Sequence, residues 1–195
     1  MLEILDALLP ETRVKLAVNG PELEQRARSR LPGDALESGR IEIIEIPYVE
    51  FWARDMGPVF VVTEEGELAI ADFNFDAWGY GDTTEAETIT EEKFDERSAG
   101  YMGLPVISSP LISEGGNREV NGKGTLIVVE AVELDRNPGM SKAGIEAEFR
   151  RLLGVKKVIW LKEGVYEDQH TFLGPIPTED GGKAYTVVTT NGHID

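Results

Sequence analysis

The last residues of the chain place an imidazole and a carboxylate close together. His193 and Asp195 lie two positions apart in the segment Asn191-Gly192-His193-Ile194-Asp195. In an extended backbone, positions i and i+2 point to the same face, so both side chains could reach one substrate. A histidine beside a carboxylate is a common arrangement for general acid–base catalysis. The sequence therefore predicts proton-transfer chemistry here, although its 195 residues contain no cysteine to act as a thiol nucleophile.

A second group of polar and aromatic side chains lies in the segment 51–58. Trp52, Arg54 and Asp55 bring an aromatic ring, a cation and an anion within four positions. In one interpretation Asp55 pairs with a cationic ligand and Trp52 stacks on it. In the other, Arg54 and Asp55 pair locally beside a core Trp52. Taken alone, these residues favour the local pair.

Paired glycines mark a third candidate segment, Ser113-Glu114-Gly115-Gly116-Asn117. Glycines let a backbone approach a ligand closely, which would leave Glu114 at the lip of a cleft. The alternative, which the segment alone favours, is a plain turn with a solvated glutamate. His170 lies in the polar run 167–170 and is interpreted as a surface residue, and Ser141 as a helix cap.

Metal and cofactor chemistry has little support in the sequence. His170 and His193 are the only histidines, so a transition-metal site would need most of its ligands from carboxylates. A carboxylate-metal hydrolase using Glu114, His193 and Asp195 remains an alternative. We expect no cofactor and no bound metal.

The composition is that of an ordinary globular protein, with 41% hydrophobic and 28% charged residues. A net charge of −17 argues against nucleic acid as a partner and suits a cationic ligand, although acidic residues can also serve solubility alone. No run approaches the length of about 18 apolar residues needed to span a membrane, and the start does not resemble a secretory signal. A cytoplasmic location is the default expectation.

The elements that must position these residues alternate between helices and strands. The acidic stretch Glu85–Arg97 is predicted to be a solvated helix, and the helix after Ser141 buries Ile145 and Phe149 and ends at Gly154. Helices followed by strands recur along the chain, which suggests a structural repeat within one α/β domain. Further helices are expected near 2–9 and 21–31, and strands at Arg13–Val18, Ile41–Ile46, Val59–Val62, Leu68–Asp72, Leu104–Ser108, Gly124–Val129, Val158–Leu161 and Ala184–Thr189.

Taken in order, several segments resemble the agmatine deiminases, which are related to the bacterial type of peptidylarginine deiminase. The resemblance implies the pentein fold, an α/β propeller of five ββαβ modules. Only about the first half to three-fifths of it would be present, so residues 1–195 would form a single incomplete catalytic domain. The matching segments are FWARDMGP (51–58), FNFDAWG (73–79), SEGGN (113–117), NGKGTLIVVE (121–130), RNPGMSK (136–142), LGVKKVIWL (153–161) and TNGHID (190–195).

The resemblance also implies roles for individual residues. In this family a cysteine attacks the guanidinium carbon, ammonia leaves, and water releases a ureido product. By motif, Asp55 and Asp195 would hold the guanidinium and His193 would be the general acid and base. Glu114 would orient His193, and Trp52 would line the substrate channel. Arg54 is a further candidate for substrate contact.

The expected reaction is the conversion of agmatine to N-carbamoylputrescine and ammonia, with the cysteine outside this chain. The alternatives are deimination of peptidyl arginine and a non-catalytic truncated module. The expected partner is a small cationic guanidine, and open strand edges could allow association as a homodimer. The sequence departs from the agmatine deiminases at Asn117-Arg118-Glu119 and in a long stretch at 167–189.

Overall fold

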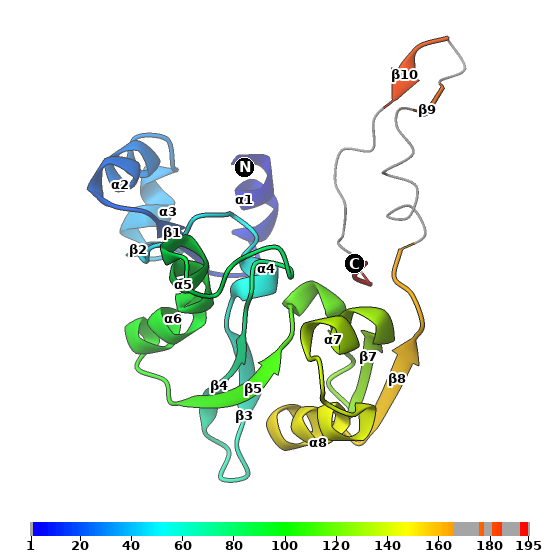
Figure 1. The fold of residues 1–195 in the computed structure, drawn as a ribbon. Coiled ribbons are helices and arrows are strands. Elements are labelled where there is room, and N and C mark those ends of the chain that lie inside the picture. The colour runs from blue at the N-terminus through cyan, green and yellow to red at the C-terminus, as the bar shows by residue number, and fades with distance from the viewer. Residues whose placement is uncertain (1, 166–175, 178–180, 185–191, 195) are drawn as a thin grey trace. The chain divides into compact units, whose positions relative to one another are not determined.

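The chain forms two compact units, residues 1–51 and residues 52–195, in the computed structural model shown in Figure 1. The structure describes residues 2–165, 176–177, 181–184 and 192–194. The expectation of one domain over residues 1–195 stays a prediction.

The first unit is a small parallel sheet with helices packed on it. Strands β1 (Val14–Val18) and β2 (Ile41–Glu45) pair in parallel, with Val14 opposite Ile41. The helix predicted from Pro21 to Leu31 ends earlier, because Pro32 disfavours the helical conformation for the residue before it. The helices are α1 (Leu2–Leu8), α2 (Pro21–Arg28) and α3 (Gly33–Glu37), and the core contains Leu5, Leu31, Ala35 and Ile41.

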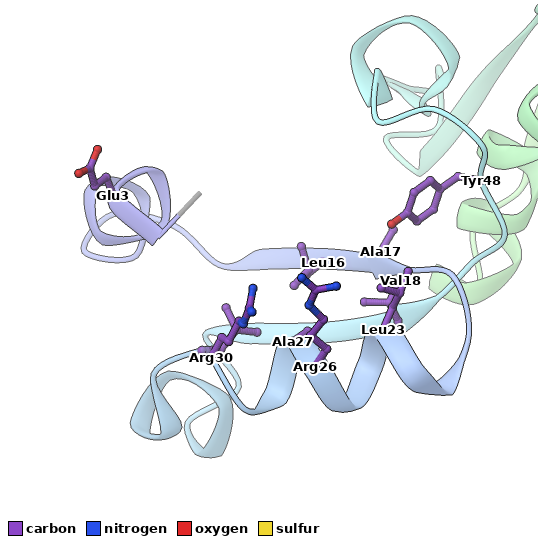
Figure 2. A pocket seen from close by; sticks show the side chains of 10 residues that line it. Glu3, Leu16, Ala17, Val18, Leu23, Arg26, Ala27, Arg30 and Tyr48 are labelled. Atoms are coloured by element: carbon purple, nitrogen blue, oxygen red, sulfur yellow. The ribbon is translucent and has the colours of Figure 1, made fainter.

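A groove of about 710 Å³ lies within this first unit, between β1 and α2 (Figure 2). Its apolar lining includes Leu16, Val18 and Leu23, and the guanidinium groups of Arg26 and Arg30 stand beside it. The lining thus carries two arginines against one glutamate, Glu3, and a net positive charge repels a cationic ligand. The groove is therefore unsuited to the guanidine predicted as substrate, and the candidate residues lie in the second unit.

The second unit contains two copies of one ββαβ arrangement. In each copy an antiparallel hairpin is followed by two helices and by a strand that pairs in parallel with the second hairpin strand. The recurrence predicted from the sequence is therefore confirmed. The first copy comprises β3 (Val59–Val62), β4 (Leu68–Asn74), α5 (Ala86–Glu92), α6 (Phe94–Met102) and β5 (Val106–Ile112); the second comprises β6 (Arg118–Val120), β7 (Thr125–Val129), α7 (Glu130–Arg136), α8 (Lys142–Leu153) and β8 (Lys157–Leu161).

One apolar core joins the two copies. Ala71 and Phe73 of β4 and Leu126 of β7 belong to the same buried cluster as Ile145 and Phe149 of α8. The predicted apolar face of this helix is thus confirmed. Ser141 caps the helix by accepting a hydrogen bond from the Gly144 amide at 3.1 Å, and Gly154 ends it in the left-handed conformation with a φ of 62°. A four-residue helix, α4 (Ala53–Met56), precedes the first copy, and a 3-10 turn, η1 (Gly115–Asn117), joins β5 of the first copy to β6 of the second.

The prediction of one solvated helix over Glu85–Arg97 is wrong. Two helices occupy this region, and Glu91 and Asp95 are buried. Burial, with a smaller contribution from the neighbouring Asp72 carboxyl, raises the pKa of Asp95 to about 8. A protonated carboxyl can share its hydrogen with a second carboxyl, which lets acidic residues occupy a buried helix face.

The predicted strand Ala184–Thr189 lies outside the described residues except for Ala184. Ile176–Pro177 (β9) and Lys183–Ala184 (β10) form a short antiparallel pair. None of the described helices is long and apolar enough to cross a membrane.

Candidate active site

The site begins where α4 packs against the turn after β5. A side-chain carbon placed on Gly115 would lie 1.8 Å from the backbone oxygen of Arg54. Only glycine allows this approach, which brings the turn carrying Glu114 and Gly116 directly onto α4. The first of the paired glycines noticed in the sequence, Gly115, therefore serves a close contact between two backbones.

Asp55 of α4 is held by two hydrogen-bond donors. The Gly116 amide donates to Oδ1 at 2.7 Å, and the Trp78 indole N–H donates to Oδ2 at 3.0 Å. One donor comes from the turn after β5 and the other from the segment after β4. The carboxylate of Asp55 is thus fixed in orientation by the first ββαβ copy and by the turn that connects it to the second.

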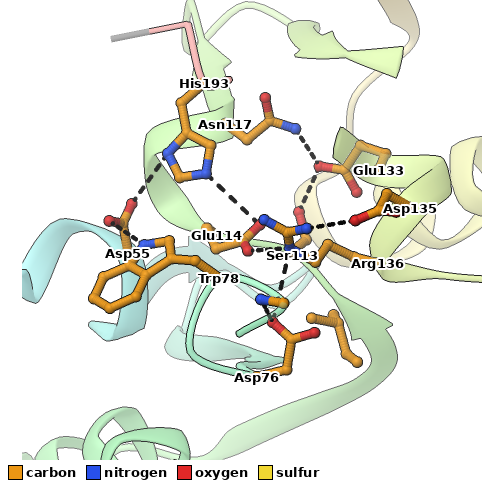
Figure 3. Close-up of polar contacts among 12 residues, drawn as sticks. Asp55, Asp76, Trp78, Ser113, Glu114, Asn117, Glu133, Asp135, Arg136 and His193 are labelled. Carbon is orange, nitrogen blue, oxygen red and sulfur yellow. Dashed lines mark hydrogen bonds and ion pairs between the residues drawn. The ribbon is translucent and has the colours of Figure 1, made fainter. Parts of the chain in front are cut away.

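His193 lies between two carboxylates, as Figure 3 shows. Its Nδ1 is 3.8 Å from Asp55 Oδ1, and its Nε2 is 3.9 Å from Glu114 Oε2. These separations exceed ordinary hydrogen-bond distances but lie within ion-pair distance. The histidine side chain is 3% exposed, so these interactions are poorly screened by water.

Glu114 is completely buried, so its interpretation as a solvated turn residue is wrong. Its Oε1 accepts a hydrogen bond from Arg136 Nε at 2.6 Å. Among the described residues, its Oε2 has no hydrogen-bond partner. One carboxylate oxygen is therefore neutralised by a buried cation while the other faces His193.

A second buried glutamate, Glu133 of α7, lies behind the turn. Its Oε1 accepts hydrogen bonds from Ser113 Oγ at 2.8 Å and from Asn117 Nδ2 at 2.9 Å. Burial raises the pKa of Glu133 to about 7, against the opposing effects of the Ser113 and Asn117 hydrogen bonds and the Arg118 charge.

The arginines beside the site have partners of their own. Arg54 forms an ion pair with Glu119 rather than with Asp55, so the predicted local pair is wrong. Arg118 lies 3.9 Å from the centroid of the Phe73 ring and donates to the Ser113 carbonyl at 2.6 Å. Burial lowers the pKa of Arg118 to about 10, so the side chain remains a cation at neutral pH.

The structure thus brings together three of the predicted site residues: Asp55, Glu114 and His193. Trp52 lies at the N-terminal cap of α4 and is 37% exposed, so it is not a core residue. Asp195 and His170, for which the sequence predicts a guanidinium contact and a surface position, lie outside the described residues.

Sequence reasoning missed Trp78, Glu133 and Arg136 as parts of the site. Trp78 lies in the segment 73–79, in which Phe73 and Phe75 are buried. Ala77 and Trp78 both have positive φ values, 54° and 60°, which non-glycine residues adopt rarely. This backbone turns the indole toward Asp55. No sequence pattern signals this backbone conformation.

The arrangement can bind a cation and move a proton. Asp55 offers carboxylate oxygens to N–H donors, and an imidazole such as that of His193 can accept and donate protons. Within the described residues, no group of three or more His, Asp or Glu side chains is arranged to hold a metal ion.

The ββαβ repeats and the site at their junction place the chain in the pentein class. The chain belongs to the Porphyromonas-type peptidyl-arginine deiminase family, whose sequence profile matches residues 1–173.

Named relatives agree with this placement. A Marinomonas sp. (strain MWYL1) protein, provisionally named agmatine deiminase, is 35% identical over 98% of this chain and 46% of its own length. The agmatine deiminase of Pseudomonas aeruginosa (strain LESB58) is 34% identical over 74% of this chain and 39% of its own length. The solved agmatine deiminase of Enterococcus faecalis matches with a TM-score of 0.72 and 28% identity, over 84% of this chain and 44% of that protein. The chain spans about half the length of the relatives that it matches.

Proposed function

We propose that this chain supplies the proton-transfer and cation-binding half of a guanidine deiminase. The proposed reaction converts agmatine and water to N-carbamoylputrescine and ammonia. The observation that carries the proposal is the position of His193 between Asp55 and Glu114, at 3.8 and 3.9 Å. The names of the relatives support the class of reaction.

Asp55 is proposed to hold the guanidinium group of the substrate. Its oxygens already accept from Gly116 and Trp78, and each oxygen has a further lone pair for a guanidinium N–H. A carboxylate that is oriented before the substrate arrives binds a planar cation without further reorganisation. Asp195 is proposed to hold the guanidinium from another side.

His193 is proposed to move the protons of the reaction. A cysteine thiolate attacks the guanidinium carbon, and His193 donates the proton that allows ammonia to leave. It then takes a proton from the water that attacks the same carbon, and the ureido product departs as the thiolate is restored. Between these steps the imidazole lies between the Asp55 and Glu114 carboxylates, at 3.8 and 3.9 Å.

The thiolate must come from a cysteine that residues 1–195 do not contain. By this mechanism, these residues alone do not deiminate a substrate. Relatives that the chain matches over less than half of their length have room for such a residue outside the matched part.

Agmatine is the proposed substrate because it carries a second positive charge at its amine end. The chain has a net charge of −17, which favours a dication over free arginine, whose carboxylate would be repelled. Arg54 lies next to Asp55 in sequence and could receive a carboxylate, but its guanidinium is engaged by Glu119.

Peptidyl arginine is the second candidate, because the matching family profile carries that name. A non-catalytic module that binds guanidines without converting them is the third. These candidates make different predictions for one experiment on the protein expressed from the complete reading frame.

The experiment measures ammonia and ureido product with agmatine, free arginine and an arginine-containing peptide in parallel. We expect agmatine to give the highest kcat/KM. Asp55→Asn should lower kcat/KM roughly tenfold to a hundredfold, because a hydrogen bond to a charged group is worth about 1.5–3 kcal/mol. The exposed Asp82→Asn is the matched control and should leave kcat/KM unchanged.

A highest kcat/KM on the peptide would replace agmatine with peptidyl arginine. Guanidine binding measured by calorimetry, without any turnover, would favour the non-catalytic module. Wild-type turnover in Asp55→Asn would remove Asp55 from the proposed site.

A further inference from the structure

We infer that Glu133 is a positioning residue, which holds the turn Ser113–Asn117 so that Glu114 and the Gly116 amide face the reacting groups. The catalytic part of this inference rests on the proposed function. The geometric part concerns the described residues alone and can be tested without turnover.

Glu133 binds both ends of the turn through one oxygen. Ser113 begins the turn and donates its hydroxyl to Glu133 Oε1 at 2.8 Å. Asn117 ends the turn and donates its amide to the same oxygen at 2.9 Å. A single acceptor on α7 therefore sets the separation of the two ends of a five-residue segment.

Two asparagines, Asn117 in the turn and Asn137 after α7, attach the turn further to the segments around α7. Asn117 Oδ1 accepts from the Val129 amide at 3.2 Å, just before α7 begins. Asn137 at the other end of α7 exchanges hydrogen bonds with the Ile112 backbone, at 3.0 and 2.8 Å. The turn and the residue before it are thus hydrogen-bonded just before the first residue of α7, at Glu133 in the middle of the helix, and just after its last residue.

Of the residues between these anchors, Glu114 provides one carboxylate of the site and Gly116 contacts the other, that of Asp55. Glu114 follows Ser113 and places Oε2 3.9 Å from His193 Nε2. Gly116 precedes Asn117 and donates its amide to Asp55 Oδ1 at 2.7 Å. Because His193 also lies 3.8 Å from Asp55, a shift of the turn would change both carboxylate contacts of the imidazole together.

Glu133 does not contact the reacting groups itself. Its side chain is completely buried, and its second oxygen, Oε2, has no hydrogen-bond partner among the described residues. Burial raises the pKa of this carboxyl to about 7, but Oε1 can accept from Ser113 and Asn117 whether or not Oε2 carries a proton. The anchoring oxygen, rather than the negative charge, is the part of the side chain that the turn requires.

The test therefore compares variants that keep or remove this oxygen in the protein expressed from the complete reading frame. Glu133→Gln keeps an oxygen acceptor without a charge, whereas Glu133→Ala removes it. Ser113→Ala removes one of the two donors and leaves the apolar packing largely intact. Glu130→Ala, on the same helix, is the control, because Glu130 is partly exposed and pairs with Lys142.

Two readouts are measured for each variant. We expect kcat to fall in Glu133→Ala on the order of tenfold to a hundredfold with little change in KM, because small displacements of catalytic groups have effects of this size. Ser113→Ala should give a smaller fall in kcat, and Glu133→Gln should stay within about threefold of the wild type.

The second readout is the imidazole NMR signal of His193, identified by its loss in His193→Gln. It should shift in Glu133→Ala and in Ser113→Ala, and remain in place in Glu133→Gln and Glu130→Ala.

The outcomes separate this inference from the proposed function. A wild-type protein that converts no guanidine removes the proposed function, while the His193 signal still decides the positioning role. An unchanged kcat and an unchanged signal in folded Ser113→Ala and Glu133→Ala would overturn the inference; if Glu133→Ala does not fold, Ser113→Ala decides alone. Glu133→Gln behaving like Glu133→Ala would also overturn it, because the charge would then matter and not the oxygen.

Discussion

Glu114 and Arg136 form an ion pair that is withdrawn from solvent. Arg136 Nε lies 2.6 Å from Glu114 Oε1, and the two side chains are 7% and 0% exposed. Gly79 makes room for the guanidinium group, because a side-chain carbon at Gly79 would lie 2.7 Å from Arg136 Nη1. The pair therefore joins α7, the turn after β5 and the segment after β4 at the site of His193.

Removing the cation of this pair should strongly destabilise the protein. In Arg136→Met the Glu114 carboxylate stays buried without its counter-ion, and loss of one partner of a buried pair costs about 3–5 kcal/mol. The free energy of unfolding, measured with urea, should fall by that amount. Arg28→Met is the control, because Arg28 pairs with Glu24 on an exposed surface and should cost about 0–1 kcal/mol. Equal losses in the two variants would contradict this account of the buried pair.

The indole of Trp78 should matter to activity through a single hydrogen bond. Trp78→Phe removes the N–H that donates to Asp55 Oδ2 at 3.0 Å but keeps an aromatic ring against Phe75. We expect kcat/KM for the guanidine to fall about tenfold, since hydrogen bonds to charged groups contribute about 1.5–3 kcal/mol.

Trp160→Phe is the matched control for this substitution. Trp160 also donates its indole N–H to a carboxylate, Glu146, at 2.8 Å, but that pair lies between β8 and α8. Its loss should leave kcat/KM unchanged. If the two tryptophan variants lose activity equally, the effect is one of general stability and not of Asp55 orientation.

The cap of α8 should contribute measurably to stability. Ser141→Ala removes the hydroxyl that accepts from the Gly144 amide at 3.1 Å and should cost about 1 kcal/mol in the free energy of unfolding. Ser141→Asn keeps a capping oxygen and should cost only a few tenths of a kcal/mol, roughly. Thermal and urea unfolding of both variants would check the difference, and an equal loss in Ala and Asn would show that the hydroxyl is not acting as a cap.

Several elements could be predicted because their signals are local. The apolar residues Ile145, Phe149 and Leu152 recur at helical spacing between a serine cap and a glycine end, and α8 follows that pattern. Asp55, Glu114 and His193 stood out because their segments combine charged side chains with glycines and match a family motif. Strand pairs with short turns, such as β3 and β4, were visible in the same way.

The rest of the site depends on contacts between segments far apart in sequence. Glu133 and Arg136 reach Ser113 and Glu114 across 20 and 22 residues, and nothing in the stretch before Arg136 distinguishes a buried glutamate from a solvated one. The boundary between β7 and α7 has no glycine or proline to mark it, because Glu130 directly follows Val129. Local pattern rules assign acidic residues to the surface, and they therefore fail where carboxyls are buried beside partners.

The carboxyls of Asp72 and Asp95 show such burial outside the site. Asp72 of β4 and Asp95 of α6 are 4% and 3% exposed. Burial, together with the charge and hydrogen bond of Asp72, raises the pKa of Asp95 from its ordinary value of 3.8 to about 8. The folded protein is therefore expected to keep a proton on this pair at neutral pH.

This proton should make stability depend on pH. Between pH 3.8 and about 8 the folded state binds more protons at Asp95 than the unfolded state, so this group's contribution to stability falls as the pH rises. The slope is at most about 1.4 kcal/mol per pH unit for one proton.

Asp95→Asn tests this pH dependence, because it resembles the protonated form and has no proton to lose. The free energy of unfolding of this variant, minus that of the wild type, should therefore increase from pH 5 to about 8. Asp82 should give the opposite pH dependence of stability. Hydrogen bonds from Thr84 lower its pKa, so the wild type loses this group's contribution as the pH falls. The stability of Asp82→Asn should therefore diverge from that of the wild type only at about pH 4 and below. A difference for Asp95→Asn that stays flat across pH 5 to about 8 would show that Asp95 is already ionised in the folded protein.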